Sequence, residues 1–211
     1  MNNILEIKNL KKIYHTKDKE ILAVEDFTLD VKEGEFIAIV GPSGCGKSTI
    51  LSVLCGLEKK SSGFINIKKN CKIGYMLQQD SLFEWRNILN NCLLGLEINK
   101  NLNEVTKKRV IDLLEDYGLK DFIYSYPDNL SGGMRQRVAL IRTLANNPNL
   151  LLMDEPFSAL DYQSRLAISD DIYNILKKEK KTMIMVTHDI AEAKFLKCVT
   201  KEIKRKNSTS S

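Results

Sequence analysis

The chain has 211 residues, 43% of them hydrophobic and 28% charged, which is enough for one sizeable globular domain. No run approaches the roughly 18–20 apolar residues of a membrane-spanning helix, and the first residues show no secretory signal. The net charge of +5 belongs entirely to residues 194–211, which leaves the rest neutral and argues against a nucleic-acid-binding surface.

Strand-like segments rich in branched and aromatic residues alternate with helix-like segments, which predicts an α/β fold. In the first half we expect strands at residues 4–8, 25–31, 35–40, 64–67 and 72–77, and a helix at residues 47–55. In the second half, apolar side chains at helical spacing predict helices at residues 104–117 and before Pro148. The continuous apolar runs at residues 150–153 and 182–187 are typical of buried parallel strands.

A glycine-rich segment follows the expected strand at residues 35–40 and fits the phosphate-binding pattern G-x-x-x-x-G-K-[ST]. Its residues are Gly41, Pro42, Ser43, Gly44, Cys45, Gly46, Lys47, Ser48 and Thr49. Glycines let backbone N–H groups turn toward phosphate oxygens, and the following helix adds the positive end of its dipole. We therefore expect ATP here, with Lys47 neutralising the β- and γ-phosphates and the Ser48 hydroxyl binding Mg²⁺.

Two adjacent carboxylates, Asp154 and Glu155, end the apolar run at residues 150–153. Ligands of parallel sheets lie at the carboxyl ends of strands, so we expect this pair beside the phosphate loop. Asp154 is expected to hold hydrated Mg²⁺ and Glu155 to polarise an attacking water. His188 follows the run at residues 182–187, where its imidazole can contact a γ-phosphate.

The segment Leu-Ser-Gly-Gly-Met-Arg-Gln-Arg at residues 130–137 resembles the signature sequence of ATP-binding cassette (ABC) proteins. Ser131, Gly132 and Gly133 precede a helix and so form a second anion-binding helix N-terminus. The resemblance implies that this terminus serves the ATP of a second subunit, in a head-to-tail homodimer. It also implies a P-loop NTPase core with a mostly parallel sheet, an N-terminal antiparallel β subdomain, and a helical subdomain at about residues 80–145.

Further family motifs follow in order and place the ABC domain at residues 1–193. Tyr14 matches the aromatic residue that stacks on adenine, and His188 matches the switch histidine. Gln78 matches the glutamine that approaches Mg²⁺ and the attacking water, although the adjacent Gln79 fits the pattern as well. Asp161 matches the dimer-contacting D-loop.

Residues 78–86 are similar to the corresponding stretch of importer ATPases for nitrate, sulfonate and taurine. The resemblance implies an ATP-hydrolysing subunit at the cytoplasmic face of the cell membrane. It would bind permease subunits directly and an extracytoplasmic solute-binding protein indirectly, and it would have no nucleic-acid partner. Leu82, Phe83 and Trp85 would then line a groove for a helix of a membrane subunit. Local core packing of these three side chains is the alternative.

Residues 194–211 form a basic, polar tail that departs from the family pattern. This departure predicts a shortened chain with an uncovered sheet edge and reduced stability, and leaves a truncated, inactive ABC remnant as an alternative. A soluble, non-transport ABC ATPase acting on DNA is disfavoured, because the roughly fifty residues between Gln78 and Ser131 are too few for a coiled coil and its return strand. The intact motif residues favour an active ATPase.

Overall fold

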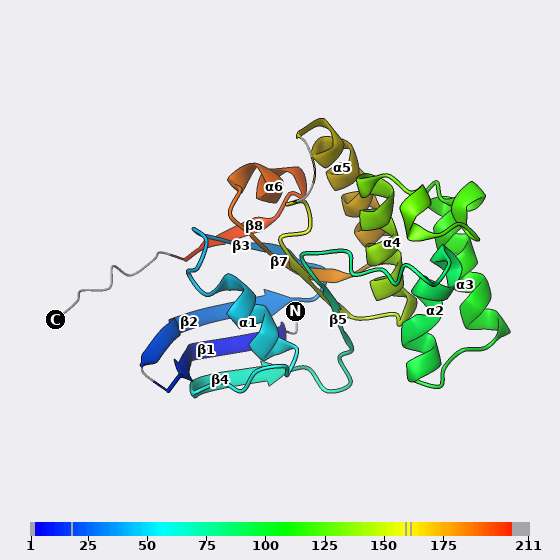
Figure 1. Cartoon of the computed structure of the whole chain (residues 1–211). Coiled ribbons are helices and arrows are strands. Elements are labelled where there is room, and N and C mark those ends of the chain that lie inside the picture. The colour runs from blue at the N-terminus through cyan, green and yellow to red at the C-terminus, as the bar shows by residue number, and fades with distance from the viewer. Residues whose placement is uncertain (1–2, 18, 159, 161, 204–211) are drawn as a thin grey trace.

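Two sheets and a set of helices make up the computed structural model, which describes residues 3–17, 19–158, 160 and 162–203 (Figure 1). An antiparallel sheet has the order β2-β1-β4, from β1 (Asn3–His15), β2 (Glu20–Lys32) and β4 (Ser62–Ile67). A parallel sheet has the order β5-β6-β7-β3-β8, from β3 (Phe36–Val40), β5 (Ile73–Met76), β6 (Leu150–Asp154), β7 (Thr182–Thr187) and β8 (Val199–Glu202). The α-helices are α1 (Lys47–Leu54), α2 (Ile88–Ile98), α3 (Glu104–Asp116), α4 (Gly132–Ala145), α5 (Tyr162–Lys178) and α6 (Ile190–Phe195).

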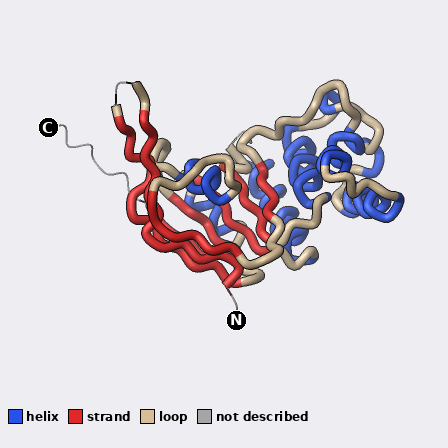
Figure 2. Tube along the Cα trace, turned by 90° about the horizontal axis from the view of Figure 1, so that it is seen from below, coloured by secondary structure: helices blue, strands red, loops and turns tan. Residues whose placement is uncertain are grey.

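The central strands β3, β6 and β7 are buried on both faces and send alternate side chains into two different cores. In β6, Leu150 and Leu152 pack with the antiparallel sheet and α1, whereas Leu151 and Met153 pack with the helices of the other face. Figure 2 shows this division, with the strands on one side and most helices on the other. The parallel sheet therefore separates α1 from α4.

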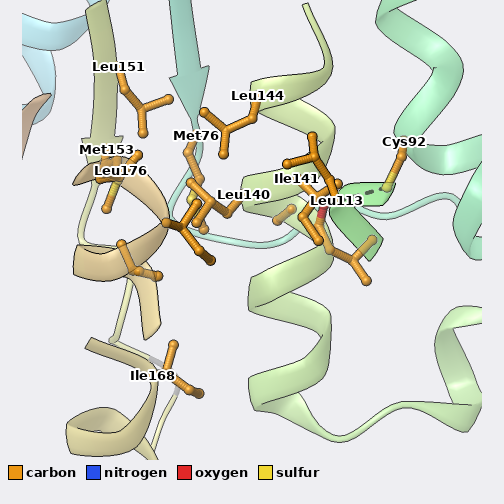
Figure 3. Packing of buried hydrophobic residues seen from close by; sticks show 14 of the residues in the cluster. Met76, Cys92, Leu113, Leu140, Ile141, Leu144, Leu151, Met153, Ile168 and Leu176 are labelled. Atoms are coloured by element: carbon orange, nitrogen blue, oxygen red, sulfur yellow. Dashed lines mark hydrogen bonds between the residues drawn. The ribbon is translucent and has the colours of Figure 1, made fainter. Parts of the chain in front are cut away.

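The helical side is held together by α4, which packs against the sheet, α2 and α3. Figure 3 shows α4 side chains between Met76 and Leu151 of the sheet and Cys92 and Leu113 of the neighbouring helices. Helix α2 was not predicted, because its apolar residues are interrupted by Asn90, Asn91 and Gly95. At Gly95 the Asn146 side chain at the end of α4 lies close to the helix, and a Cβ there would be 2.1 Å from Asn146 Nδ2.

The segment expected to be a separate tail joins the fold over most of its described length. The expected boundary between residues 193 and 194 falls inside α6, where Ala193 and the following Leu196 are buried. Strand β8 then pairs in parallel with β3 and is the last strand on that side of the sheet, so the expectation of an uncovered sheet edge stays a prediction. All four β8 residues are exposed, and residues 204–211 lie outside the described part of the chain.

Among the residues that the structure describes, no helix combines the length and the apolar character needed to cross a bilayer.

Candidate functional site

The phosphate loop connects the carboxyl end of β3 to the start of α1 and wraps around the Lys47 side chain. Lys47 is 4% exposed, and its Nζ donates hydrogen bonds to the carbonyl oxygens of Gly41 (2.8 Å) and Pro42 (3.0 Å). The Gly41 N–H donates to the Thr187 carbonyl at 3.3 Å, which ties the loop to the neighbouring strand β7. The ammonium group is thus fixed inside the curve of the loop.

Two glycines of the loop adopt left-handed backbone conformations, with φ of 78° at Gly44 and 96° at Gly46. A Cβ at Gly46 would lie 2.1 Å from the Ala23 carbonyl oxygen, so Gly46 lets β2 approach the loop. Helix α1 has no side-chain cap and no acidic residue in its first turn. Its first N–H groups have no side-chain acceptor there, which fits the binding of a phosphate anion.

The other predicted loop residues lie around this anion-binding end. Pro42 and Ser43 are exposed, whereas Cys45 and Thr49 are partly buried. The Cys45 side chain fills space beside Gly41, where its Sγ lies 2.8 Å from a Cβ built at that glycine.

Asp154 ends β6 beside the start of α1 and is 7% exposed. Its Oδ1 accepts a hydrogen bond from Ser48 Oγ at 2.9 Å, and its Oδ2 accepts one from the Tyr75 hydroxyl at 3.1 Å. Burial, and then the charge and hydrogen bond of Asp154, raise the pKa of Tyr75. A hydroxyl and a carboxylate held together are the hard oxygen donors that suit Mg²⁺. Tyr75 was not predicted from the sequence, because its position follows from the register of β5 on β6.

Glu155 lies between Lys47 and His188. Its Oε1 is 3.8 Å from Lys47 Nζ, and its Oε2 is 3.2 Å from His188 Nδ1. Glu155 has a φ of 42°, a left-handed conformation that costs roughly 1–2 kcal/mol for a residue with a Cβ. The Glu155 N–H donates to the Val186 carbonyl at 3.0 Å, which helps to hold this backbone. Strained backbone of this kind concentrates at functional sites.

Gln78 lies in the exposed segment after β5 and reaches toward the loop that follows Glu155. Its Nε2 is 3.5 Å from Ser158 Oγ, at the limit of a hydrogen bond. Gln79 instead accepts a hydrogen bond from Ser81 through its backbone carbonyl. The Gln78 side chain thus reaches the loop after Glu155, and the choice between Gln78 and Gln79 stays a prediction.

The signature residues lie at the start of α4, on the helical side of the parallel sheet. Ser131 is the N-cap, and its Oγ accepts a hydrogen bond from the Met134 N–H at 3.4 Å. Ser131 and Gly132 are exposed, whereas Gly133 packs against Ile168 of α5. Within the described ranges, no hydrogen bond or ion pair joins the signature to the phosphate loop.

Tyr14 and Asp161 were also predicted to belong to the site. Tyr14 pairs with Ile21 in the β1–β2 ladder, and its ring lies 4.4 Å from Lys12 Nζ. No hydrogen bond or ring contact between Tyr14 and the phosphate loop is found among the described residues. Asp161 lies outside the described residues, so its predicted role stays a prediction.

A cavity of about 740 Å³ opens beside the phosphate loop. It is bordered by β2 residues including Ile21 and Leu22, by Gly44 and Cys45 of the loop, and by residues 201–203. The end of the described chain therefore borders the same face of the loop as β2.

Comparison with known proteins identifies similar sequences over nearly the whole chain. Residues 24–158, more than half of the chain, match the model of the ABC transporter family. An uncharacterised ABC transporter ATP-binding protein of Bacillus subtilis, YtlC, is 47% identical over 90% of this chain and 76% of its own length. The aliphatic sulfonates import ATP-binding protein SsuB of Bacillus cereus is 37% identical over 91% of this chain and 78% of its own length.

The fold is similar to that of the ABC transporter cassette MJ0796. The dimeric structure of that cassette has a TM-score of 0.80 and 35% identity, and the match covers 95% of this chain and 94% of MJ0796. A second structure of it, in a post-hydrolysis state bound to ADP and Pi, has the same TM-score at 31% identity and covers 98% and 99%.

Proposed function

We propose that this chain, which belongs to the ATP-binding subunits of ABC transporters and is an ATPase, drives the import of a small solute. The observation that carries the hydrolytic part is the position of Glu155 between Lys47 and His188. The importer assignment is supported by residues 78–86 and by the similarity to a sulfonate import protein. The solute class we propose is that of nitrate, sulfonates and taurine.

In this proposal the phosphate loop binds ATP, and Lys47 neutralises charge on the β- and γ-phosphates. Ser48 and Asp154, with Gln78 nearby, would hold Mg²⁺, which when bound neutralises phosphate charge. Glu155 orients and polarises the attacking water, and His188 contacts the γ-phosphate while its Nδ1 stays beside Glu155. Tyr75 holds the second Asp154 oxygen and so fixes the carboxylate plane.

We further propose that the site is completed by a second copy of the chain in a head-to-tail dimer with two ATP molecules. The exposed N-cap Ser131 and its neighbour Gly132 offer a second anion-binding helix terminus on a different side of the molecule from α1. The dimeric structure of the similar cassette MJ0796 supports this assembly. Tyr14 would stack on the adenine, and Asp161 would contact the second copy.

The surface for the membrane subunits is proposed at the segment after Gln78. Leu82 is buried, Phe83 is partly buried, and Trp85 is 75% exposed with its ring centroid 4.8 Å from that of Phe83. The core-packing alternative thus applies to Leu82, while Trp85 remains available for a permease helix. The chain would act at the cytoplasmic face of the membrane, reach the solute-binding protein only through the permease, and bind no nucleic acid.

The hydrolytic proposal is tested by replacing Glu155 with Gln. We expect the kcat for ATP to fall by about 100-fold or more, because the group that polarises the water is lost. The ATP-bound dimer should accumulate, as measured by light scattering with size-exclusion chromatography. Glu115→Gln, at an exposed site on α3, is the matched control and should behave as the unmodified chain. Equal, background-level rates for the unmodified chain and Glu155→Gln would favour the inactive remnant.

The membrane assignment is tested by co-purification with permease subunits from detergent-solubilised membranes. Trp85→Ala should reduce the amount of permease recovered, whereas Leu57→Ala, which removes another exposed apolar side chain, should not. Undiminished recovery with Trp85→Ala would count against this surface. ATPase stimulation of the purified complex by a sulfonate, nitrate or taurine with its binding protein would then identify the solute.

A further inference from the structure

A group of polar side chains lies behind His188, at the junction of β7 and α6. Thr187 and Glu192 are buried, and the Thr187 hydroxyl donates a short hydrogen bond to Glu192 Oε2. The same Thr187 oxygen accepts a hydrogen bond from the Asp189 N–H at 3.0 Å. Asp189 Oδ1 accepts a hydrogen bond from the Ala191 N–H at 2.7 Å and so caps α6. The segment on both sides of His188 is therefore internally cross-linked.

Arg165 of α5 joins this segment to the loop that follows Glu155. Its Nη1 is 3.0 Å from Asp189 Oδ2 and 3.3 Å from Glu192 Oε1. Its Nη2 donates a hydrogen bond to the Leu160 carbonyl at 3.1 Å. One guanidinium group thus holds both the chain after His188 and the chain after Glu155.

The loop on the Glu155 side is itself a series of tight turns. The Ser158 N–H donates to the Glu155 carbonyl at 3.1 Å, and the Leu160 N–H donates to the Phe157 carbonyl at 3.1 Å. Two hydrogen-bonded turns thus connect Leu160 to Glu155 along the chain. The Glu155 N–H bond to Val186 fixes the backbone at one point but does not orient either side chain.

Arginine suits this junction because its planar group offers several donors in a fixed geometry. The contact between Arg165 Nη1 and Glu192 Oε1 is an ion pair without hydrogen-bond alignment, and Glu192 is 1% exposed. Burial raises the pKa of Glu192, opposed by its hydrogen bond with Thr187 and by the Arg165 charge. Loss of the Arg165 cation would leave this carboxyl without its counter-charge.

We propose that Arg165 is a positioning residue that sets the geometry of the Glu155–His188 pair by fixing the segments that follow both residues. The inference rests on the proposed function, in which Glu155 and His188 act together in hydrolysis. Arg165 contacts neither side chain of the pair in the described contacts, so it acts through Asp189, Glu192 and Leu160.

The test compares Arg165→Met and Arg165→Lys in the full chain. Arg165→Met should lower kcat by about 10–100-fold, because small misplacements of reacting groups have effects of that size, while the affinity for ATP stays within about threefold. Arg165→Lys keeps the charge and should recover part of kcat. Lys178→Met is the control. Lys178 lies on α5 like Arg165 and forms an exposed ion pair with Asp116 of α3, and its loss should leave kcat unchanged.

A second readout separates positioning from simple stabilisation. The chain has two histidines, so the imidazole resonances of His188 can be assigned in a ¹H–¹³C spectrum with the help of His15→Gln. Arg165→Met should shift the His188 resonances in the folded, nucleotide-free protein. A lowered melting temperature with unchanged kcat per folded molecule and unchanged His188 resonances would overturn the inference.

Two further variants cover the cases in which Arg165→Met does not fold or the proposed function itself is wrong. If Arg165→Met does not fold, the double variant Arg165→Met with Glu192→Gln removes both charges of the buried pair, and the same loss of kcat is expected of it. Glu155→Gln tests the proposed function separately. A large effect of Glu155→Gln together with wild-type kcat for the folded Arg165 variants would overturn this inference alone.

Discussion

Gly132 and Gly133 are neighbours at the start of α4, yet an added methyl group meets different surroundings at the two positions. At Gly133, a Cβ would lie 2.5 Å from Cδ1 of Ile168, which is 3% exposed and therefore hard to displace. At Gly132, the nearest atom is Leu160 Cδ2 at 3.5 Å, an ordinary contact. The two alanine variants form a matched pair, in which one residue is exposed and the other is packed.

The expected changes in stability follow from these contacts. Replacing a helical glycine with alanine stabilises by about 0.4–1 kcal/mol where the backbone is compatible, so Gly132→Ala should be as stable as the unmodified chain or slightly more so. Overpacking a buried contact costs about 1–3 kcal/mol, and the gain from placing alanine in a helix offsets part of this cost. Gly133→Ala should therefore range from unchanged to about 2 kcal/mol less stable. Urea unfolding followed by circular dichroism measures both.

Activity should follow a different order from stability. If the exposed start of α4 approaches a nucleotide bound to a second copy, the methyl group of Gly132→Ala occupies that space and should lower kcat by about tenfold or more. Binding of a fluorescent ATP analogue to the monomer should be unchanged, because the loop around Lys47 is intact. A stable Gly132→Ala variant with wild-type kcat would refute the close approach.

Three further outcomes are expected from single changes. Leu82→Ala should cost about 2–5 kcal/mol in urea unfolding because Leu82 is buried, whereas Trp85→Ala should cost less than about 1 kcal/mol. Gly46→Ala should abolish ATP binding in calorimetry, because its Cβ would lie 2.1 Å from a β2 carbonyl at a φ of 96°. Burial raises the pKa of Asp80, but hydrogen bonds from Arg135 and a backbone N–H outweigh it and hold the pKa below the usual 3.8. The stability that Asp80 adds over Asp80→Asn should therefore be present above pH 3.8 and be lost as the pH falls below it, in urea curves from pH 7 to about 2.5.

The central strands were predictable because strands covered on both faces have continuous apolar sequences. The antiparallel strands extend well beyond the expected residues 4–8 and 25–31. The pairing of their outer halves is interrupted by register shifts, which break the regular alternation that marks a strand in the sequence. Strand β8 was missed because its four residues are all exposed and two of them are charged, so only its backbone pairing with β3 defines it.

In the candidate site, the residues within local motifs could be predicted and the residues that support them could not. Lys47, Ser48 and Glu155 belong to contiguous patterns whose strand–loop–helix context is readable in the sequence. Tyr75 and Arg165 reach the site from other elements, and their partners lie 79 and 24 residues away along the chain. Such contacts depend on strand register and helix packing, which no local pattern specifies.

The alternation within the central strands also bears on why the proposed site needs a second copy. Because successive β6 residues enter opposite cores, α1 with its phosphate loop and α4 with the signature are held against opposite faces of one sheet. Gly133 is packed on α5 and fixes the start of α4 to that face, while Ser131 and Gly132 remain exposed. Closing the signature onto the loop within one chain would require taking apart both cores, whereas a second copy can present the same exposed helix terminus without disturbing either.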